Sequence, residues 1–212
     1  GSTGIFPDIF FSLLLISGVS AISESKKTFI VVTGVTIVTL LLHWTRSLSA
    51  SPILDVLDYI ATTTIIVLFC IVVLAKVMKE GPITVHRILG AIAVYLLLGL
   101  AWAHTYGLIT YVDPAAFTGA VVTGGGRFSS WTYFSLVTLA TLGYGDIAPV
   151  NPVARSLATA ETITGQLYLA ILIARLVSQE LYYRQTTTDA DAISPETHSA
   201  NKAHSRPKER IR

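Results

Sequence analysis

The chain has 212 residues, of which 52% are hydrophobic and 13% charged, and its formal net charge is +2. A soluble domain would carry about a quarter charged residues, so this composition indicates an integral membrane protein. The small net charge gives no reason to expect a nucleic-acid partner. The single cysteine excludes a disulfide within the chain.

Three apolar segments occupy the first third of the sequence. Residues 5–23, 28–43 and 53–75 are predicted to cross the membrane as helices, because isolated strands would leave their backbone unpaired in lipid. A cleaved signal peptide is the alternative for residues 5–23, but the basic stretch that such a peptide needs is absent in front of it. Residues 1–4 read as a cloning remnant.

Two further apolar segments, residues 88–112 and 153–179, are predicted to span the membrane in the second half of the chain. After them the sequence becomes polar, with almost no large apolar residues from Thr186 onward. Such a composition cannot build a core, so residues 182–212 are predicted to form a disordered tail.

A shorter segment lies between these two spans. Residues 113–128 contain three consecutive glycines and are predicted to be a loop. The following run begins at Ser129 or Ser130, either of which can cap a helix, and ends near Ala140. Because this run is too short to cross the bilayer, we predict a helix that enters the membrane and returns.

The sequence Thr-Leu-Gly-Tyr-Gly-Asp follows this short helix at residues 141–146. Glycine enters the left-handed backbone region without a steric clash, so Gly143 and Gly145 permit alternating dihedrals that turn successive carbonyls to one side. A row of carbonyls can replace the water around a cation. The alternatives are a simple turn and a dinucleotide-binding glycine motif, but the third glycine of that motif is absent.

This motif, preceded by Ser-Leu-Val-Thr-Leu-Ala and flanked by apolar spans, resembles the pore module of potassium channels over residues 85 to about 179. The resemblance implies an all-α membrane protein: a multi-span helical bundle with a re-entrant pore helix and an extended selectivity filter. Accessory transmembrane helices (residues 5–81) would precede a two-helix pore domain (residues 82–181). The implied ion-binding residues are Thr141, Leu142, Gly143, Tyr144 and Gly145, with K⁺ held at the first four.

Side chains around the filter are expected to hold it at one width. The ring of Tyr144 can pack against Trp131, Tyr133 or Phe134. Thr138 and Asp146 are two further predicted filter-supporting residues. In simple bacterial channels a pore-helix glutamate often pairs with the filter aspartate, but the matching position here is Val137. Asp146 is therefore expected to accept a hydrogen bond from Tyr133 or, as second candidate, Trp131.

The last span carries the predicted gate. Gly165 falls on the glycine that resembles the gating hinge of simple bacterial channels, and close helix packing is the equally weighted alternative. The resemblance also makes four residues of this span candidates to line the cavity: Gln166, Leu169, Ile173 and Val177. The three apolar ones could close it by dewetting. Glu161 and Arg175 could pair between helices or face water, and both alternatives stay open.

Charge distribution predicts the orientation. If the C-terminal tail is cytoplasmic, as the resemblance implies, 12 of the 15 Lys and Arg residues lie on the cytoplasmic side, in accordance with the positive-inside rule. Five spans then place the N-terminus outside. This is one span fewer than the six-span channel plan, whose first helix we expect to be absent. The third span lacks the arginines of a voltage sensor.

The predicted function is therefore passive, K⁺-selective conduction by a homotetramer in the cell (inner) membrane, with the lipid bilayer and K⁺ as partners. No cofactor and no nucleic acid are expected. The alternatives are a weakly selective cation channel and a subunit of a potassium uptake transporter. The usual alteration of the Tyr-Gly pair in weakly selective channels is absent, and one complete filter differs from the several degenerate repeats of transporters. An enzyme is not expected, because no catalytic motif accompanies the polar residues.

Overall fold

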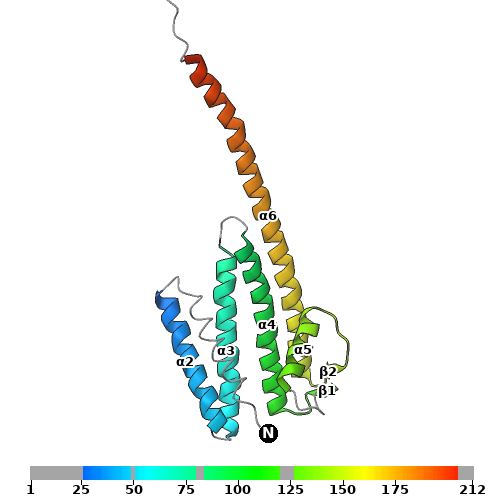
Figure 1. The fold of residues 1–212 in the computed structure, drawn as a ribbon. Coiled ribbons are helices and arrows are strands. Elements are labelled where there is room, and N and C mark those ends of the chain that lie inside the picture. Colours follow the sequence, from blue (N-terminus) through cyan, green and yellow to red (C-terminus); the bar gives the residue numbers. More distant parts are fainter. Residues whose placement is uncertain (1–25, 49–50, 80–83, 120–126, 205–212) are drawn as a thin grey trace, which may run out of the picture.

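The computed structural model describes residues 26–48, 51–79, 84–119 and 127–204. Residues 1–25, with the first predicted span, and the run of three glycines lie outside these ranges, as do residues 205–212. The elements in chain order are α2 (Lys26–Leu48), α3 (Pro52–Val77), α4 (Val85–Val112), β1 (Phe117–Gly119), α5 (Arg127–Leu139), β2 (Ile147–Pro149) and α6 (Pro152–His204) (Figure 1).

Four of the described helices are long and apolar enough to cross a membrane. Their apolar stretches comprise residues 26–45, 52–77, 85–112 and 152–181, which agree within a few residues with the last four predicted spans. The prediction of an all-α, multi-pass membrane protein is confirmed. The β-branched run of α2 is helical, as expected for a segment that must pair its own backbone in lipid.

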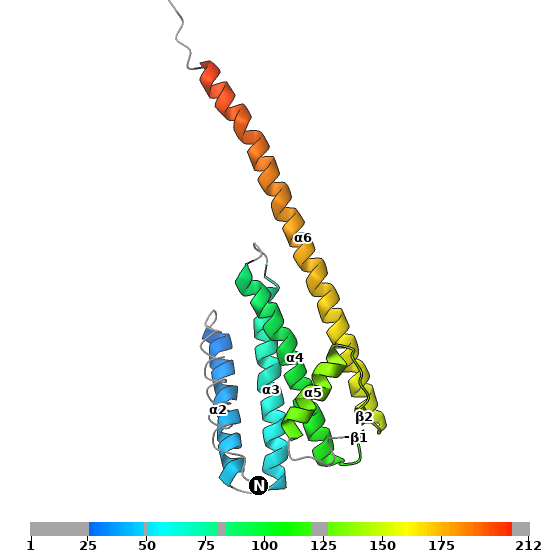
Figure 2. The same cartoon turned by 45° about the vertical axis from the view of Figure 1, so that its right-hand side comes forward.

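The spanning helices form a row in which α3 lies between α2 and α4, while α4 contacts both α5 and α6 (Figures 1 and 2). A buried apolar cluster joins α2, α3 and α4, and it comprises Val32, Ile65, Ile66, Phe69 and Ala101. The short helix α5 lies against α4 and α6 at one end of the bundle, beside the two strands. The accessory helices are thus attached to α5 through α4.

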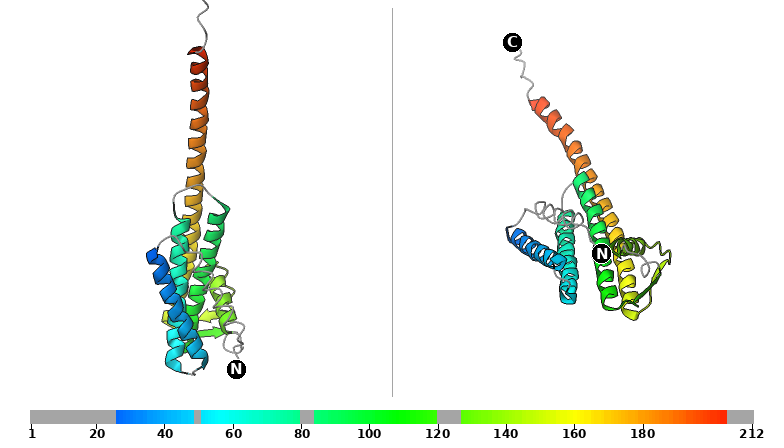
Figure 3. Two further views of the ribbon diagram at one scale, coloured as in Figure 1. Left: turned by 60° about the vertical axis from the view of Figure 1, so that its left-hand side comes forward. Right: turned by 60° about the horizontal axis from the view of Figure 1, so that its bottom comes forward.

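The two ends of the bundle differ in charge. The start of α2, the end of α3 and the start of α4 share the end at which α6 leaves the bundle (Figures 1 and 3). Basic residues of the described part of the chain are found there, among them Lys26, Lys27, Lys76, Lys79, Arg87 and Arg175. The strands β1 and β2 lie at the opposite end. Successive spanning helices therefore run in opposite directions, as the charge pattern predicts.

Three predicted boundaries are wrong. The loop prediction for residues 113–128 missed β1 (Phe117–Gly119), which pairs antiparallel with β2 (Ile147–Pro149). Helix α5 begins at Arg127, so Ser129 and Ser130 lie inside its first turn instead of capping it.

The third boundary concerns the tail. Helix α6 continues to His204, whereas disorder was predicted from residue 182. A polar composition excludes a core, but a segment that extends an existing helix needs none, because adding a residue costs far less than nucleating a new helix. Figure 3 shows this part of α6 projecting beyond the bundle.

Candidate functional site: the loop between α5 and α6

The φ angles of residues 141–145 alternate in sign. Thr141, Gly143 and Gly145 have φ angles of 60°, 58° and 79°, whereas Leu142 and Tyr144 between them have negative φ. This alternation is the one predicted from the two glycines, and it turns successive carbonyls toward one side of the chain. The positive φ of Thr141 was not predicted, since a β-branched residue in this region is strained by roughly 1–2 kcal/mol.

The conformation of Thr141 follows from the way α5 ends. The N–H of Leu142 donates to the carbonyl of Val137 (2.8 Å), and the N–H of Thr141 donates to the carbonyl of Thr138 (3.0 Å). These two bonds form a Schellman motif, which requires a left-handed residue at the position that Thr141 occupies. The N-terminal end of the motif is therefore fixed to the last turn of α5, and the backbone carbonyl of Thr138 accepts one of the two hydrogen bonds.

The C-terminal end of the motif is fixed by the strand pair. Gly119 of β1 pairs with Ile147 of β2, immediately after Asp146. A Cβ at Gly119 would lie 1.9 Å from the carbonyl oxygen of Asp146, and its φ is +110°, so this position requires glycine. Asn151 extends the anchor, because its Nδ2 donates to Asp113 (2.8 Å) while its Oδ1 accepts the N–H of Ala154 and caps α6.

Aromatic side chains divide between two sides of α5. Tyr133 stacks on Tyr144 with a centroid distance of 6.5 Å and an interplanar angle of 9°. Trp131 and Phe134 pack in a buried cluster with Tyr106 of α4 and Phe117 of β1. Of the three ring partners predicted for Tyr144, Tyr133 is the one stacked on it. Phe117 and Tyr106 were not predicted, because they come from segments distant in sequence.

Tyr133 also bonds the last residue of the motif. Its hydroxyl donates to the carboxylate of Asp146, as predicted for the first of the two candidate donors. Desolvation, this hydrogen bond and the charge of Asp146 raise the pKa of Tyr133, which therefore remains a donor at neutral pH. Val137, which replaces the pore-helix glutamate of simple bacterial channels, is buried.

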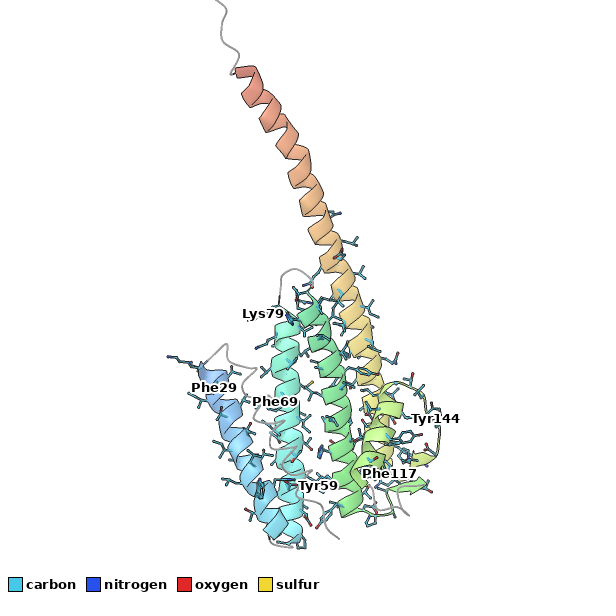
Figure 4. All side chains as sticks on the ribbon, viewed as in Figure 1. Phe29, Tyr59, Phe69, Lys79, Phe117 and Tyr144 are labelled. Carbon is cyan, nitrogen blue, oxygen red and sulfur yellow. The ribbon has the colours of Figure 1, made fainter. Side chains whose placement is uncertain are left out.

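One side of this loop is not covered by any of the residues that the structure describes. All residues from Ala140 to Asp146 are exposed, including the side chains of Leu142 (57%) and Tyr144 (66%). Figure 4 shows Tyr144 on the side of α5 that faces away from α2 and α3. One aliphatic and one aromatic side chain, Leu142 and Tyr144, are thus largely exposed beside a constrained backbone. Such exposed apolar patches are typical of surfaces that another molecule covers.

Comparison with known proteins bears on this same region. A family described as ion channel matches residues 92–180, from the first half of α4 through α5 and the loop to the membrane-spanning part of α6. This part of the chain is therefore similar to ion channels. We refer to residues 92–180 as the pore module.

The chain is also similar to a potassium channel. The inward rectifier potassium channel Kirbac3.1 of Paramagnetospirillum magnetotacticum is 36% identical over 86 residues, which cover 35% of this chain and 29% of that protein. The chain thus spans less than a third of the length of this relative. The resemblance to a prokaryotic potassium-channel pore that the TLGYGD motif indicated is confirmed for this region.

In the pore module the predicted cavity residues lie on one exposed face of α6. Gln166, Leu169, Ile173 and Val177 are all exposed in the single chain, at helical spacings of three and four residues. Gly165 is buried instead, and a Cβ there would lie 2.4 Å from the carbonyl oxygen of Leu139. Close packing of α6 against the end of α5 therefore explains this glycine, whereas a hinge at Gly165 stays a prediction.

The two ionisable residues of α6 whose partners were left open bond to other helices. Glu161 is fully buried and accepts a hydrogen bond from Tyr106 of α4 (2.6 Å), while Ser135 of α5 lies in hydrogen-bond contact with its other oxygen. A guanidinium N–H of Arg175 donates to the carbonyl of Met78, just after α3. Neither residue pairs with the other. The apolar spacing of α6 gave no signal for these partners.

Proposed function

We propose that the chain is one subunit of a homotetrameric, K⁺-selective channel, which conducts passively through a filter formed by the backbone of residues 141–145. The alternating φ angles at Thr141, Gly143 and Gly145 are the observation that carries this proposal. Such a backbone presents a column of carbonyl oxygens, which can replace the hydration shell of K⁺ at successive positions.

The exposure of the loop supports assembly. A single chain contributes carbonyls from one side, and a dehydrated cation requires oxygens around its whole circumference. Residues 140–146 and the stripe from Gln166 to Val177 are both exposed in the single chain. Four copies about one axis would bury the first surface around the ion path and let the second line a cavity beneath it.

The charge pattern supports an orientation with the C-terminal part of α6 in the cytoplasm. The end of the bundle at which α6 projects carries Lys76, Lys79 and Arg87, and the opposite end carries the strand pair. By the positive-inside rule the basic end faces the cytoplasm, here of the inner membrane. The filter then opens outward. The potassium channel to which the chain is similar supports K⁺ as the permeant ion.

Reconstitution into liposomes tests the proposal. The purified protein should pass K⁺ down its gradient, with a reversal potential in mixed K⁺ and Na⁺ near the value for K⁺ alone. A reversal potential near zero would favour the weakly selective cation channel. Flux that saturates or needs a coupled ion would favour the transporter subunit.

A matched pair of glycine variants separates the filter from general effects of a methyl group. In Gly143→Ala the new Cβ meets no described residue of the same chain within 4 Å, so its cost comes from the φ of +58° and from neighbouring copies. Gly34→Ala adds the same methyl group on α2, where none of the residues placed by the structure lies within 4 Å of it. We expect Gly143→Ala to abolish K⁺ flux and Gly34→Ala to retain it. Equal fluxes in both variants would refute the proposed filter.

A further inference from the structure

A buried carboxyl joins the three helices of the pore module behind the filter. Glu161 of α6 is fully buried, and Tyr106 of α4 donates to its Oε2 at 2.6 Å. Ser135 of α5 is also fully buried and contacts Oε1 of the same carboxyl. Ser135 precedes Thr141, the first residue of the alternating backbone, by less than two helical turns.

The hydroxyl of Ser135 has two neighbours but one hydrogen. Its Oγ lies 2.7 Å from the carbonyl oxygen of Gly99 in α4 and also contacts Oε1 of Glu161. The carbonyl can only accept a hydrogen bond. If Ser135 gives its hydrogen to Gly99, the contact with Glu161 is a hydrogen bond only when the carboxyl itself supplies a proton. A neutral Glu161 thus satisfies every polar atom in the group.

The surroundings of Glu161 favour the neutral form. Within the part of the chain that the structure describes, its hydrogen-bond partners are uncharged hydroxyls and no basic side chain pairs with it. The titratable groups that face it are Tyr106 and Tyr95 of α4, which are neutral when protonated, while α5 presents Ser135. A buried carboxylate without a cation is costly, and a buried carboxylic acid that donates and accepts is not.

Close packing explains why the group can act on the filter. A Cβ at Gly99 would lie 2.7 Å from a methyl group of Leu136, so the glycine lets α4 and α5 approach until Ser135 reaches the Gly99 carbonyl. On the other side Gly165 of α6 lies against the carbonyl of Leu139. Helix α5 is therefore packed against α4 on one side and α6 on the other. The carboxyl of Glu161, on α6, lies where side chains of α4 and α5 both contact it.

We propose that Glu161 is a positioning residue of the pore. As a neutral carboxylic acid it donates a hydrogen bond to Ser135 and accepts one from Tyr106, and so fixes α5 and the filter relative to α4 and α6. This inference rests on the proposed function where it concerns the filter. The protonation state of Glu161 and its bonds between helices do not depend on that function.

Infrared difference spectra test the protonation state. Spectra of the membrane-reconstituted wild-type protein and of Glu161→Gln would be compared at neutral pH. We expect the variant to lose a band of a protonated, hydrogen-bonded carboxyl C=O. Loss of carboxylate bands instead would overturn the proposal. Glu180→Gln is the matched control, because Glu180 lies on the same helix but is exposed, and this variant should keep the band of the protonated carboxyl.

Conduction tests the positioning role. An amide at position 161 can still donate to Ser135 and accept from Tyr106, so Glu161→Gln should retain K⁺ flux within about twofold. Glu161→Leu has a side chain of similar size but removes the acceptor of the Tyr106 hydroxyl and the donor to Ser135, and its flux should fall roughly tenfold or more. Wild-type flux in Glu161→Leu would overturn the proposal, as would an equal loss in Glu161→Gln.

Thermal unfolding separates the failures. If the wild-type protein passes no K⁺, the proposed function fails, and the same samples still decide the bonding of Glu161. The double-mutant cycle of Tyr106→Phe and Glu161→Leu should then show non-additive shifts in melting temperature, because each substitution alone already removes the hydrogen bond between these two residues. Additive shifts would overturn the bonding assigned to Glu161.

Discussion

The contact between Gly165 and Leu139 gives the most informative mutation, Gly165→Ala. A Cβ at Gly165 would lie 2.4 Å from the carbonyl oxygen of Leu139, where ordinary contact begins at 3.4 Å, so the two helices must separate by about 1 Å. The atom that must move belongs to the backbone of the last turn of α5. That turn ends in the Schellman motif that holds Thr141 in the left-handed region.

The magnitude follows from two opposing effects. Inserting a methyl group into a packed contact costs about 1–3 kcal/mol. Replacing glycine by alanine within a helix stabilises by up to about 1 kcal/mol. We therefore expect Gly165→Ala to be destabilised by roughly 0–3 kcal/mol and to displace the start of the proposed filter. A hinge without close packing predicts the opposite sign, because only the helix preference would remain.

Thermal unfolding of the reconstituted or detergent-solubilised protein measures this sign. Gly34→Ala is the control, since its new methyl group meets none of the described residues within 4 Å and leaves the helix preference alone. We expect the melting temperature of Gly165→Ala to lie below that of Gly34→Ala, and K⁺ flux to fall only in the former. A melting temperature of Gly165→Ala at or above that of the control would refute the packing explanation.

Three other substitutions have defined outcomes. Gly119→Ala places a Cβ 1.9 Å from the carbonyl oxygen of Asp146 at a φ of +110°, so a loss of about 2–5 kcal/mol is expected in chemical unfolding; an unchanged midpoint would contradict the β1–β2 anchor. Tyr133→Phe removes the donor to Asp146 and should shorten open times or weaken selectivity, which unchanged single-channel records would disprove. Arg175→Met removes the guanidinium bond to Met78 and should cost about 1–3 kcal/mol, checked by the same unfolding assay.

The spanning helices and the motif could be predicted from sequence because both are local signals. Apolar length determines a membrane helix almost without regard to context, and four predicted spans agree with the structure. The two glycines of the motif permit positive φ by their own chemistry, and both adopt it. Tyr133 was predicted as the donor to Asp146 because it is an O–H donor that precedes the motif on the predicted short helix.

The remaining parts depend on contacts between distant segments. Phe117 and Tyr106 enclose Trp131 and Phe134 from segments whose sequences read as a loop and a uniformly apolar span. Three residues of a strand are too few to show alternation, so β1 became visible only through its pairing with β2. The positive φ of Thr141 contradicts the preference of its residue type and arises from the bonding at the end of α5.

The strand pair beside the proposed filter has a consequence for the variation expected among related sequences. A ladder of main-chain bonds is indifferent to most side chains, so Thr118 and Ala148, which face each other in it, can be exchanged for other residues without loosening the outer rim. Position 119 has no such freedom, because its backbone touches that of Asp146. Among related sequences that keep this strand pair, we expect the other residues of both strands to vary and the glycine at the position of Gly119 to be invariant. This glycine lies some two dozen residues before the proposed filter.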